Sequence, residues 1–466
     1  MAEPQSYSKE MSEKGVGPLE ENPVELSPLE KTTKGRWERS WPTIACGAGL
    51  FSDGYLNQVI GPVGTMLTQI YGDAYTNSTA QQNVSSIVFA GTVVGMLIFG
   101  YTSDHWSPLG AGSYGAGGSL GGMLAALTAY RFFLGIGIGG EYPAGSVGAA
   151  ENTGELKSGH RNRWFIMFTN FQIDFGFVVA ALVSMILVLI FTEDHLHACW
   201  RVALGLGMDE PEEFNRERMH KFPILLIIKF YWKRLAVVSI IWFLYDFSAY
   251  SFGIYSSAWL NIILGDTAPL WKSFGWTTVV NSFYIPGSAL GAFMSDWIGP
   301  RYTLAIGVGL QGVIGFIMAG CYKWLATSEN VAAFVVVFGI FSALGEMGPG
   351  DNIGLCAAKT SATAIRGQYY SYAAAIGKIG AFVGTYVIPV IQKNAPNPIR
   401  AGQDPFFVSS SLCILAAFMA IFMMPQIDQD TITLEDARFR DYLEANGYDT
   451  TQMGSNNYQS DTRDQE

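Results

Sequence analysis

Two charged residues lie inside a long apolar stretch of the sequence. Residues 131–151 are apolar enough to cross a bilayer, yet they include Arg131 and Glu141. A charge at the centre of a membrane helix costs ~2.5–3.5 kcal/mol on insertion scales, so its presence predicts a functional site. Small residues let a second helix approach closely, and this stretch has glycines at 135, 137, 139 and 140. A close-packed helix that holds a carboxylate within the membrane is typical of a transporter core.

A lysine and an acid–aromatic stripe could bind an anion. Lys378 lies in the middle of the apolar run Ala-Ile-Gly-Lys-Ile-Gly. Because an unpaired buried lysine is costly, we expect a bound anion or a carboxylate beside it, and a permanent structural ion pair is the alternative. Trp242, Asp246 and Tyr250 fall at i, i+4 and i+8, on one face of a helix. The aromatic side chains can donate hydrogen bonds to phosphate oxygens, whereas Asp246 could take a proton or pair with Lys378. Aromatic residues alone would favour packing, but the acid between them favours function.

Other acids within apolar stretches are candidates for carrying protons. Asp53, in Phe-Ser-Asp-Gly-Tyr, and Glu141 are the two that we assign to proton coupling. A buried carboxyl group can change its protonation in response to a modest pH difference. Arg131 is expected either to hold one of these acids, to assist proton release, or to serve helix packing. Asp174 is a further intramembrane acid that could contact a polyol group.

The composition is that of a polytopic membrane protein. Charged residues make up 14% of the chain and hydrophobic residues 49%, whereas soluble domains carry about 25% charge. The net charge of −11 is concentrated at the ends, because residues 1–35 hold seven acids against four bases and residues 426–466 hold ten against three. The balanced body gives no indication of nucleic-acid binding. The five cysteines are far apart, so neither a disulfide framework nor a metal site is indicated.

Apolar stretches long enough for ~30 Å of hydrocarbon predict an all-α fold. The ten stretches cover roughly 42–62, 85–102, 120–146, 164–191, 234–258, 276–296, 303–324, 331–350, 368–391 and 406–424. We expect a disordered tail over 1–40, a helical bundle over 41–207, a cytosolic loop over 208–233, a second bundle over 234–425 and a disordered acidic tail over 426–466.

The distribution of basic residues conflicts with ten spans. With an inside N-terminus, the sequons at Asn77 and Asn83 lie outside, but the basic loop around Arg161 would then also lie outside, against the positive-inside rule. One more span before residue 120 and one between 200 and 220 would remove the conflict. The sequence changes abruptly at both places, so we infer that the third and sixth of twelve helices are absent. A genuine ten-span protein with its third and fourth spans inverted is the alternative.

The two halves of the chain carry similar motifs at corresponding positions, as an internal repeat does. Ser103-Asp104 closes the second stretch, and Ser295-Asp296-Trp-Ile-Gly-Pro-Arg301 closes the sixth. Such repeats suggest two bundles with a solute site between them.

Together with Arg131 and its glycines, these motifs resemble the major facilitator superfamily. Gly-Gly-Glu-Tyr-Pro at 139–143, with residues 242–250, resembles its phosphate:proton symporter branch. The runs GEYPAGSVGAAE, YDFSAYSFGIYSS, GEMGPGDNIGLCAAKT and AIRGQYYSYAAAIGKIGAF resemble fungal glycerophosphoinositol and glycerophosphocholine permeases.

This resemblance covers about residues 40–425. It implies twelve spans in two bundles, alternating access and proton-coupled uptake of a phosphate-bearing solute by a monomer. It also implies that Tyr142, Gln172 and Asn352 lie near the phosphate. At the cytosolic ends of the spans, it assigns inter-helix gating to Asp104, Asp296 and Arg301. The loop after Asp104 departs from the family by lacking its Gly-Arg-Arg/Lys continuation.

We therefore expect a multi-pass plasma-membrane proton symporter for glycerophosphodiesters, with both tails cytosolic. An ester of charge −1 entering a cell works against ~2.3 kcal/mol per 100 mV, which one co-transported proton cancels. An inorganic-phosphate or other organic-anion symporter is one alternative, and a non-transporting sensor or inactive truncated transporter is another. The sequence has no HExxH motif, no nucleophile with a nearby base and no nucleotide loop, so we expect neither an enzyme nor a cofactor.

Overall fold

The computed structural model describes residues 36–99, 119–154, 159–206, 224–265, 267–427, 431–448 and 450. Its contacts group the chain into two units, residues 1–41 and residues 42–466. Of the first unit only residues 36–41 are described, and they are helical. The sections below concern the second unit.

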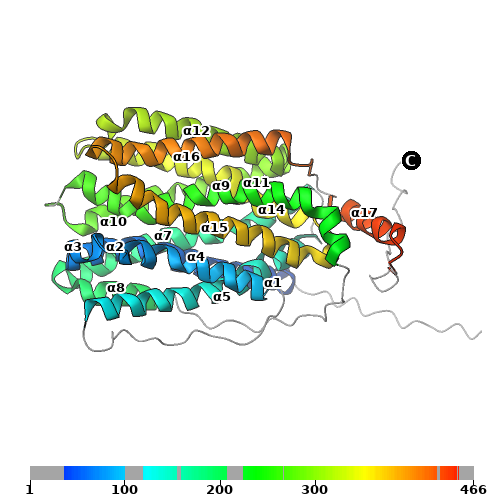
Figure 1. The fold of residues 1–466 in the computed structure, drawn as a ribbon, viewed down its shortest axis with the longest axis horizontal. Helices are drawn as coiled ribbons and strands as arrows, with labels where there is room; N and C mark the ends of the chain where they lie inside the picture. Colours follow the sequence, from blue (N-terminus) through cyan, green and yellow to red (C-terminus); the bar gives the residue numbers. More distant parts are fainter. Residues whose placement is uncertain are drawn as a thin grey trace, which may run out of the picture. The chain divides into compact units, whose positions relative to one another are not determined.

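The regular structure of the described residues is entirely helical (Figure 1). The helices of the first half of the chain are α1 (Arg36–Gln58), α2 (Ile60–Tyr71), α3 (Asp73–Thr76), α4 (Ala80–Phe99), α5 (Leu120–Gly154), α6 (Arg161–Phe168), α7 (Asn170–Phe191), η2 (Glu193–His195) and α8 (Leu196–Gly205). Those of the second half are α9 (Ile224–Leu264), α10 (Leu270–Ser282), α11 (Tyr284–Trp297), α12 (Pro300–Leu325), α13 (Val331–Gly345), the π-helical turn η3 (Glu346–Gly350), α14 (Asp351–Lys359), η4 (Thr363–Ile365), α15 (Arg366–Lys393), α16 (Pro398–Phe422) and α17 (Thr431–Ala445).

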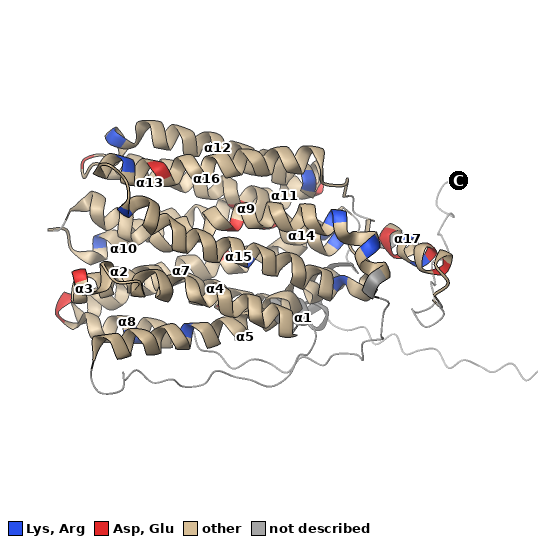
Figure 2. Cartoon of the chain, in the orientation of Figure 1, with Lys and Arg blue, Asp and Glu red and all other residues tan. Residues whose placement is uncertain are grey.

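Eight described helices are long and apolar enough to cross a membrane. Charged residues gather towards the ends of the helices, and most of the helix length carries none (Figure 2). The predicted spans 42–62 and 276–296 are not among the eight, and each is divided between two helices, α1 and α2 or α10 and α11.

Proline explains three breaks in these helices. Pro62, Pro286 and Pro349 each follow the last residue of the preceding helix by four positions, since α1, α10 and α13 end at Gln58, Ser282 and Gly345. A proline ring removes one hydrogen bond and collides with the carbonyl group four residues earlier. The third break is the π-helical turn η3, and single turns of this kind are frequent at functional sites.

Glycines bring α4 and α5 into close contact in a parallel arrangement. A Cβ atom on Gly91 would lie 3.1 Å from the Cα of Gly135, and one on Gly95 would lie 2.9 Å from the Cα of Gly139. The paired numbers rise together, so the two helices point the same way. If the spans alternate in direction, a chain with parallel α4 and α5 must cross the membrane once more between them. The connecting residues 100–118 lie outside the described residues, so the predicted absence of the third span stays a prediction.

Two predicted segment boundaries need correction. The helix expected to begin at residue 234 begins at Ile224, inside the predicted cytosolic loop. The tail expected to be disordered from residue 426 contains α17. Helix α17 is held by apolar packing of Phe439 against Phe230 and by an ion pair between Glu435 and Arg234.

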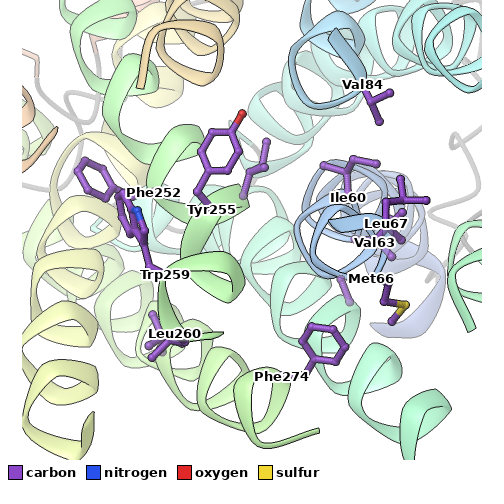
Figure 3. Packing of buried hydrophobic residues seen from close by; sticks show 14 of the residues in the cluster. Ile60, Val63, Met66, Leu67, Val84, Phe252, Tyr255, Trp259, Leu260 and Phe274 are labelled. Atoms are coloured by element: carbon purple, nitrogen blue, oxygen red, sulfur yellow. The ribbon is translucent and has the colours of Figure 1, made fainter. Parts of the chain in front are cut away.

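One large apolar cluster joins helices from both halves of the chain. Figure 3 shows Ile60, Val63 and Met66 of α2 in the same cluster as Phe252 and Trp259 of α9. Burial of such side chains is the main source of stability outside the membrane and supplies close packing within it.

Candidate functional site

A cavity is lined by helices from both halves of the chain. It leaves about 500 Å³ unfilled by protein atoms, its opening included. The side chains and glycines that line it are Gln58, Tyr142, Asn170, Ile173, Phe177, Trp242, Tyr245, Asp246, Ala249, Tyr250, Gly253, Tyr284, Glu346, Gly350, Ile353 and Lys378.

The buried amine of Lys378 is the cationic group of this cavity. Its Nζ lies 3.2 Å from Asp246 Oδ2 and donates a hydrogen bond of 2.5 Å to the hydroxyl group of Tyr250. The same amine lies 4.0 Å from the ring centre of Tyr250 and 5.0 Å from that of Tyr142. The side chains of Lys378 and Asp246 are 2% and 3% exposed, so both charges are withdrawn from water.

Helices α9 and α15 position these groups. The predicted stripe Trp242, Asp246 and Tyr250 does face one cavity from α9. Trp242 fits against α15 because Gly377 has no side chain, and a Cβ there would lie 2.5 Å from the indole ring. The Tyr250 ring is packed against Phe89 of α4.

Two residues that the resemblance assigned to the phosphate are not part of the cavity lining. Tyr142 does line it, but neither Gln172 nor Asn352 is among the described residues that do. The amide group of Asn352 donates to the carbonyl oxygens of Met347 and Gly348, and its oxygen accepts from Ser295. The Asn352 side chain therefore donates hydrogen bonds to backbone carbonyl groups at η3, where the regular helix is interrupted. The amide of Gln172 donates to the carbonyl of Met167, and the side chain packs against α1.

The two predicted proton carriers are near each other. A Cβ on Gly49 would lie 1.8 Å from a carboxyl oxygen of Glu141, so this carboxyl group lies against α1 one turn before Asp53. Asp53 is 2% exposed and is close enough to Glu141 and Lys378 to interact with both charges. Its Oδ2 is buried and accepts no hydrogen bond from the described residues.

Arg131 is fully buried but forms no ion pair with the described acids. Its NH1 donates a 3.5 Å hydrogen bond to the carbonyl oxygen of Leu56. Its other terminal nitrogen and Nε have no hydrogen-bond partner among the described residues. The helix-packing alternative therefore fits its present contacts.

Polar contacts join the two halves of the chain near one end of the helices. Arg163 of α6 lies 3.2 Å from Asp296 at the end of α11. Beside them, Asn162 donates to the carbonyl oxygen of Ser295 and accepts a 2.5 Å hydrogen bond from Lys359.

The other two residues assigned to gating are not part of this contact. Arg301 donates to the carbonyl oxygens of Ala420 and Ile421 on α16, within the second half. Asp104 lies outside the described residues. The gating role of all three residues stays a prediction.

Several polar residues at the cavity were not assigned from the sequence. Asn170, Tyr245 and Glu346 line it, and Asp351 lies directly behind Asn170. Glu346 and Asp351 stand in an apolar stretch, as Asp53 and Glu141 do, so the same criterion would have found them.

These groups can bind an anion and exchange protons. Lys378 has three donor hydrogens, and the nearby Trp and Tyr side chains can add neutral donors. The described residues hold no group of three or more His, Cys, Asp or Glu side chains that could bind a metal ion.

Comparison with known proteins identifies the family. The family model for sugar (and other) transporters matches residues 209–438. An MFS-type transporter of Aspergillus flavus is 30% identical, with 87% of each chain covered. The chain belongs to the major facilitator superfamily. Within it, a glycerophosphodiester transporter and a major glycerophosphoinositol permease, both of Candida albicans, are each 50% identical over 91% of this chain and 86% of theirs. These relatives are carriers, not enzymes.

Solved structures agree on the major facilitator fold. A proton:xylose symporter bound to a bromodeoxyglucose aligns with a TM-score of 0.65 at 14% identity, covering 86% of this chain and 99% of that one. The inward-open xylose transporter of E. coli aligns with a TM-score of 0.56 at 17% identity and the same coverage.

The alignment with the Candida albicans glycerophosphodiester transporter also bears on the two helices that we expect to be absent. It has 464 positions but takes in 91% of this 466-residue chain, so about forty of its positions have no counterpart here. Two membrane helices of ~20 residues each would account for that length.

Proposed function

We propose that this major facilitator protein imports a glycerophosphodiester, such as glycerophosphoinositol or glycerophosphocholine, together with protons. The observation that carries the proposal is the buried Lys378 amine, which meets Asp246 and Tyr250 in a cavity lined by both halves of the chain. Half-identical relatives named as glycerophosphodiester carriers support the choice of solute.

In the proposed binding step, the phosphodiester anion competes with Asp246 for Lys378. Charge-assisted hydrogen bonds to phosphate are among the stronger polar contacts, which offsets the loss of the anion's water. Trp242 and Tyr142 line the same cavity and would donate to the remaining phosphate oxygens. Protonation of Asp53 and Glu141 would supply the positive charge that accompanies the anion.

In the proposed transport step, a bundle over 41–207 and a bundle over 234–425 rock about this cavity, with 208–233 as the connecting loop. The protein would lie in the plasma membrane as a monomer with both tails cytosolic. The contact between Arg163 and Asp296 would then close the cytosolic end.

Uptake into proteoliposomes tests this function. Labelled glycerophosphoinositol and glycerophosphocholine should accumulate when an inward proton gradient is imposed, and inorganic phosphate should compete weakly. Accumulation of phosphate without competition from either diester would instead establish an inorganic-phosphate symporter.

A non-transporting protein is the second candidate, favoured by the parallel order of α4 and α5 and by the forty unmatched positions. The chain as printed and a version with both missing helices supplied from the Candida albicans transporter should be compared. Uptake by the second version alone would assign the printed chain to an inactive or sensing role.

A further inference from the structure

Three carboxyl groups from both halves of the chain converge on one amide group. The carboxyl trio consists of Asp174 of α7, Glu346 of η3 and Asp351 of α14. Nδ2 of Asn170 lies 3.4, 2.9 and 3.0 Å from their oxygens, respectively. The three acids are only 0%, 6% and 1% exposed.

The trio has more acceptor oxygens than the surrounding donors can satisfy. The amide group has two hydrogens for three carboxyl groups. Ser288 donates to Asp351 over 2.6 Å and Tyr245 donates to Glu346 over 2.9 Å. Oδ1 of Asp174 and Oδ2 of Asp351 remain buried with no hydrogen-bond partner among the described residues.

The trio has no cation in direct contact among the described residues, and Lys378 interacts with Glu346 only at longer range. No Lys, Arg or His side chain among them forms an ion pair with any of the three acids. Their arrangement does not suit a metal ion either. Three bare carboxylates gathered around one amide nitrogen would repel strongly away from water, so this arrangement favours the binding of a proton by at least one of them.

The trio borders the cavity in which we propose that the solute binds. Asn170 and Glu346 form part of the cavity lining, and Asp174 and Asp351 lie behind them. Protons can therefore reach the trio from the site where the solute binds. The titratable groups that face the trio from neighbouring helices are Tyr245, Asp246 and Tyr250 of α9, Tyr284 of α11 and Lys378 of α15.

We propose that the carboxyl trio is a proton-binding site, separate from Asp53 and Glu141, whose protons hold the two halves of the chain together here. The coupling to transport rests on the proposed function. A proton from the cavity converts a carboxylate into a carboxylic acid that donates to its neighbour, and its departure restores the repulsion. Since Asp174 belongs to the first half and Asp351 to the second, proton release favours separation of α7 from α14.

Neutral substitutions test the coupling. Asp174→Asn and, separately, Asp351→Asn keep the size of the side chain but remove its ability to bind and release a proton. Both should lower the number of protons carried per solute and flatten the pH profile of net uptake, while solute exchange at equal pH persists. The matched control is Asp404→Asn, which neutralises a partly exposed acid paired with Arg400 on α16 and should change neither quantity.

Infrared spectroscopy tests proton binding without transport. The carbonyl band of protonated carboxyl groups should be present in the unsubstituted protein at neutral pH and should weaken in Asp174→Asn, and in Glu346→Gln if the first variant does not fold. Bands and proton ratios equal to those of Asp404→Asn would overturn this proposal and leave the carrier function standing. A band that weakens as expected in a protein without uptake would support the proton site and refute the carrier function.

Discussion

At the scale of single residues, the proposed binding site depends on the amine of Lys378, which is buried and paired with the carboxylate of Asp246. Lys378 and Asp246 stabilise each other through their ion pair, so removal of one leaves the other as a buried uncompensated charge. A substitution of Lys378 therefore changes both solute binding and protein stability, and the test must include a variant that separates the two effects.

Replacement of Lys378 by alanine should weaken solute binding because its charge-assisted hydrogen bonds to the phosphodiester are lost. We expect a loss of ~1.5–3 kcal/mol, or about 10- to 150-fold in Kd, measured by calorimetry in detergent. The double variant Lys378→Ala/Asp246→Asn removes the orphaned charge and should regain thermal stability without regaining affinity. Lys323→Ala, on the exposed end of α12, is the control, and unchanged affinity in Lys378→Ala would exclude the lysine from the site.

The sequence predicted the pairing of Lys378 with Asp246 better than it predicted the neighbours of the neutral polar residues. Lys378, Asp246 and Tyr250 could be grouped because helical spacing fixes one face of α9 and because buried charges need partners. The amide of Asn352 could not be placed, since its partners are backbone carbonyl groups freed by the break at Pro349. The carboxyl trio depends on contacts between residues more than 170 positions apart, which no local pattern reports.

At the scale of elements, glycine pairs set how closely α4 and α5 approach. Gly135→Ala would place a Cβ 2.1 Å from the carbonyl oxygen of Val88 and should destabilise the protein by ~1–3 kcal/mol through overpacking. Gly121→Ala, in the same helix with no atom within 4 Å, is the matched control and should be neutral or slightly stabilising. Thermal unfolding in detergent measures both, and equal melting temperatures would contradict the close contact.

The ion pair between α6 and α11 should hold one end of the cavity closed. Asp296→Asn removes it, and we expect a loss of ~1 kcal/mol, or about a fivefold rise in the open population. A cysteine introduced by Ile353→Cys, which lies on the cavity wall, would report this as faster labelling.

The exchanged pair Arg163→Asp/Asp296→Arg should restore the slow labelling rate, because the attraction between the two helices returns. If Asp296→Asn and the exchanged pair label at the same rate as the unsubstituted protein, the contact does not contribute to closure.

At the scale of the whole molecule, the direction of α5 distinguishes the two possible paths of the chain through the membrane, one with ten alternating spans and one in which a third span is absent. Strict alternation over ten spans would make α4 and α5 antiparallel, so α5 would begin at the membrane face opposite Asn77. The glycine contacts make them parallel, so Ser119 and the exposed sequon at Asn77 belong to the same face. The basic loop near Arg161 then falls on the other face, as the positive-inside rule requires.

An impermeant thiol reagent can decide between these paths. In a chain that carries Cys321→Ser, because Cys321 is exposed, the added change Ser119→Cys should react in intact cells, from the face on which the sequon at Asn77 is expected to lie. A cysteine from Ala445→Cys, on α17 at the opposite end of the helices from α3, should react only after permeabilisation (Figure 1). The same chain without either added cysteine gives the background. Labelling of position 119 only after permeabilisation would restore the antiparallel path, and with it the ten-span protein, because α5 would then begin on the cytosolic face.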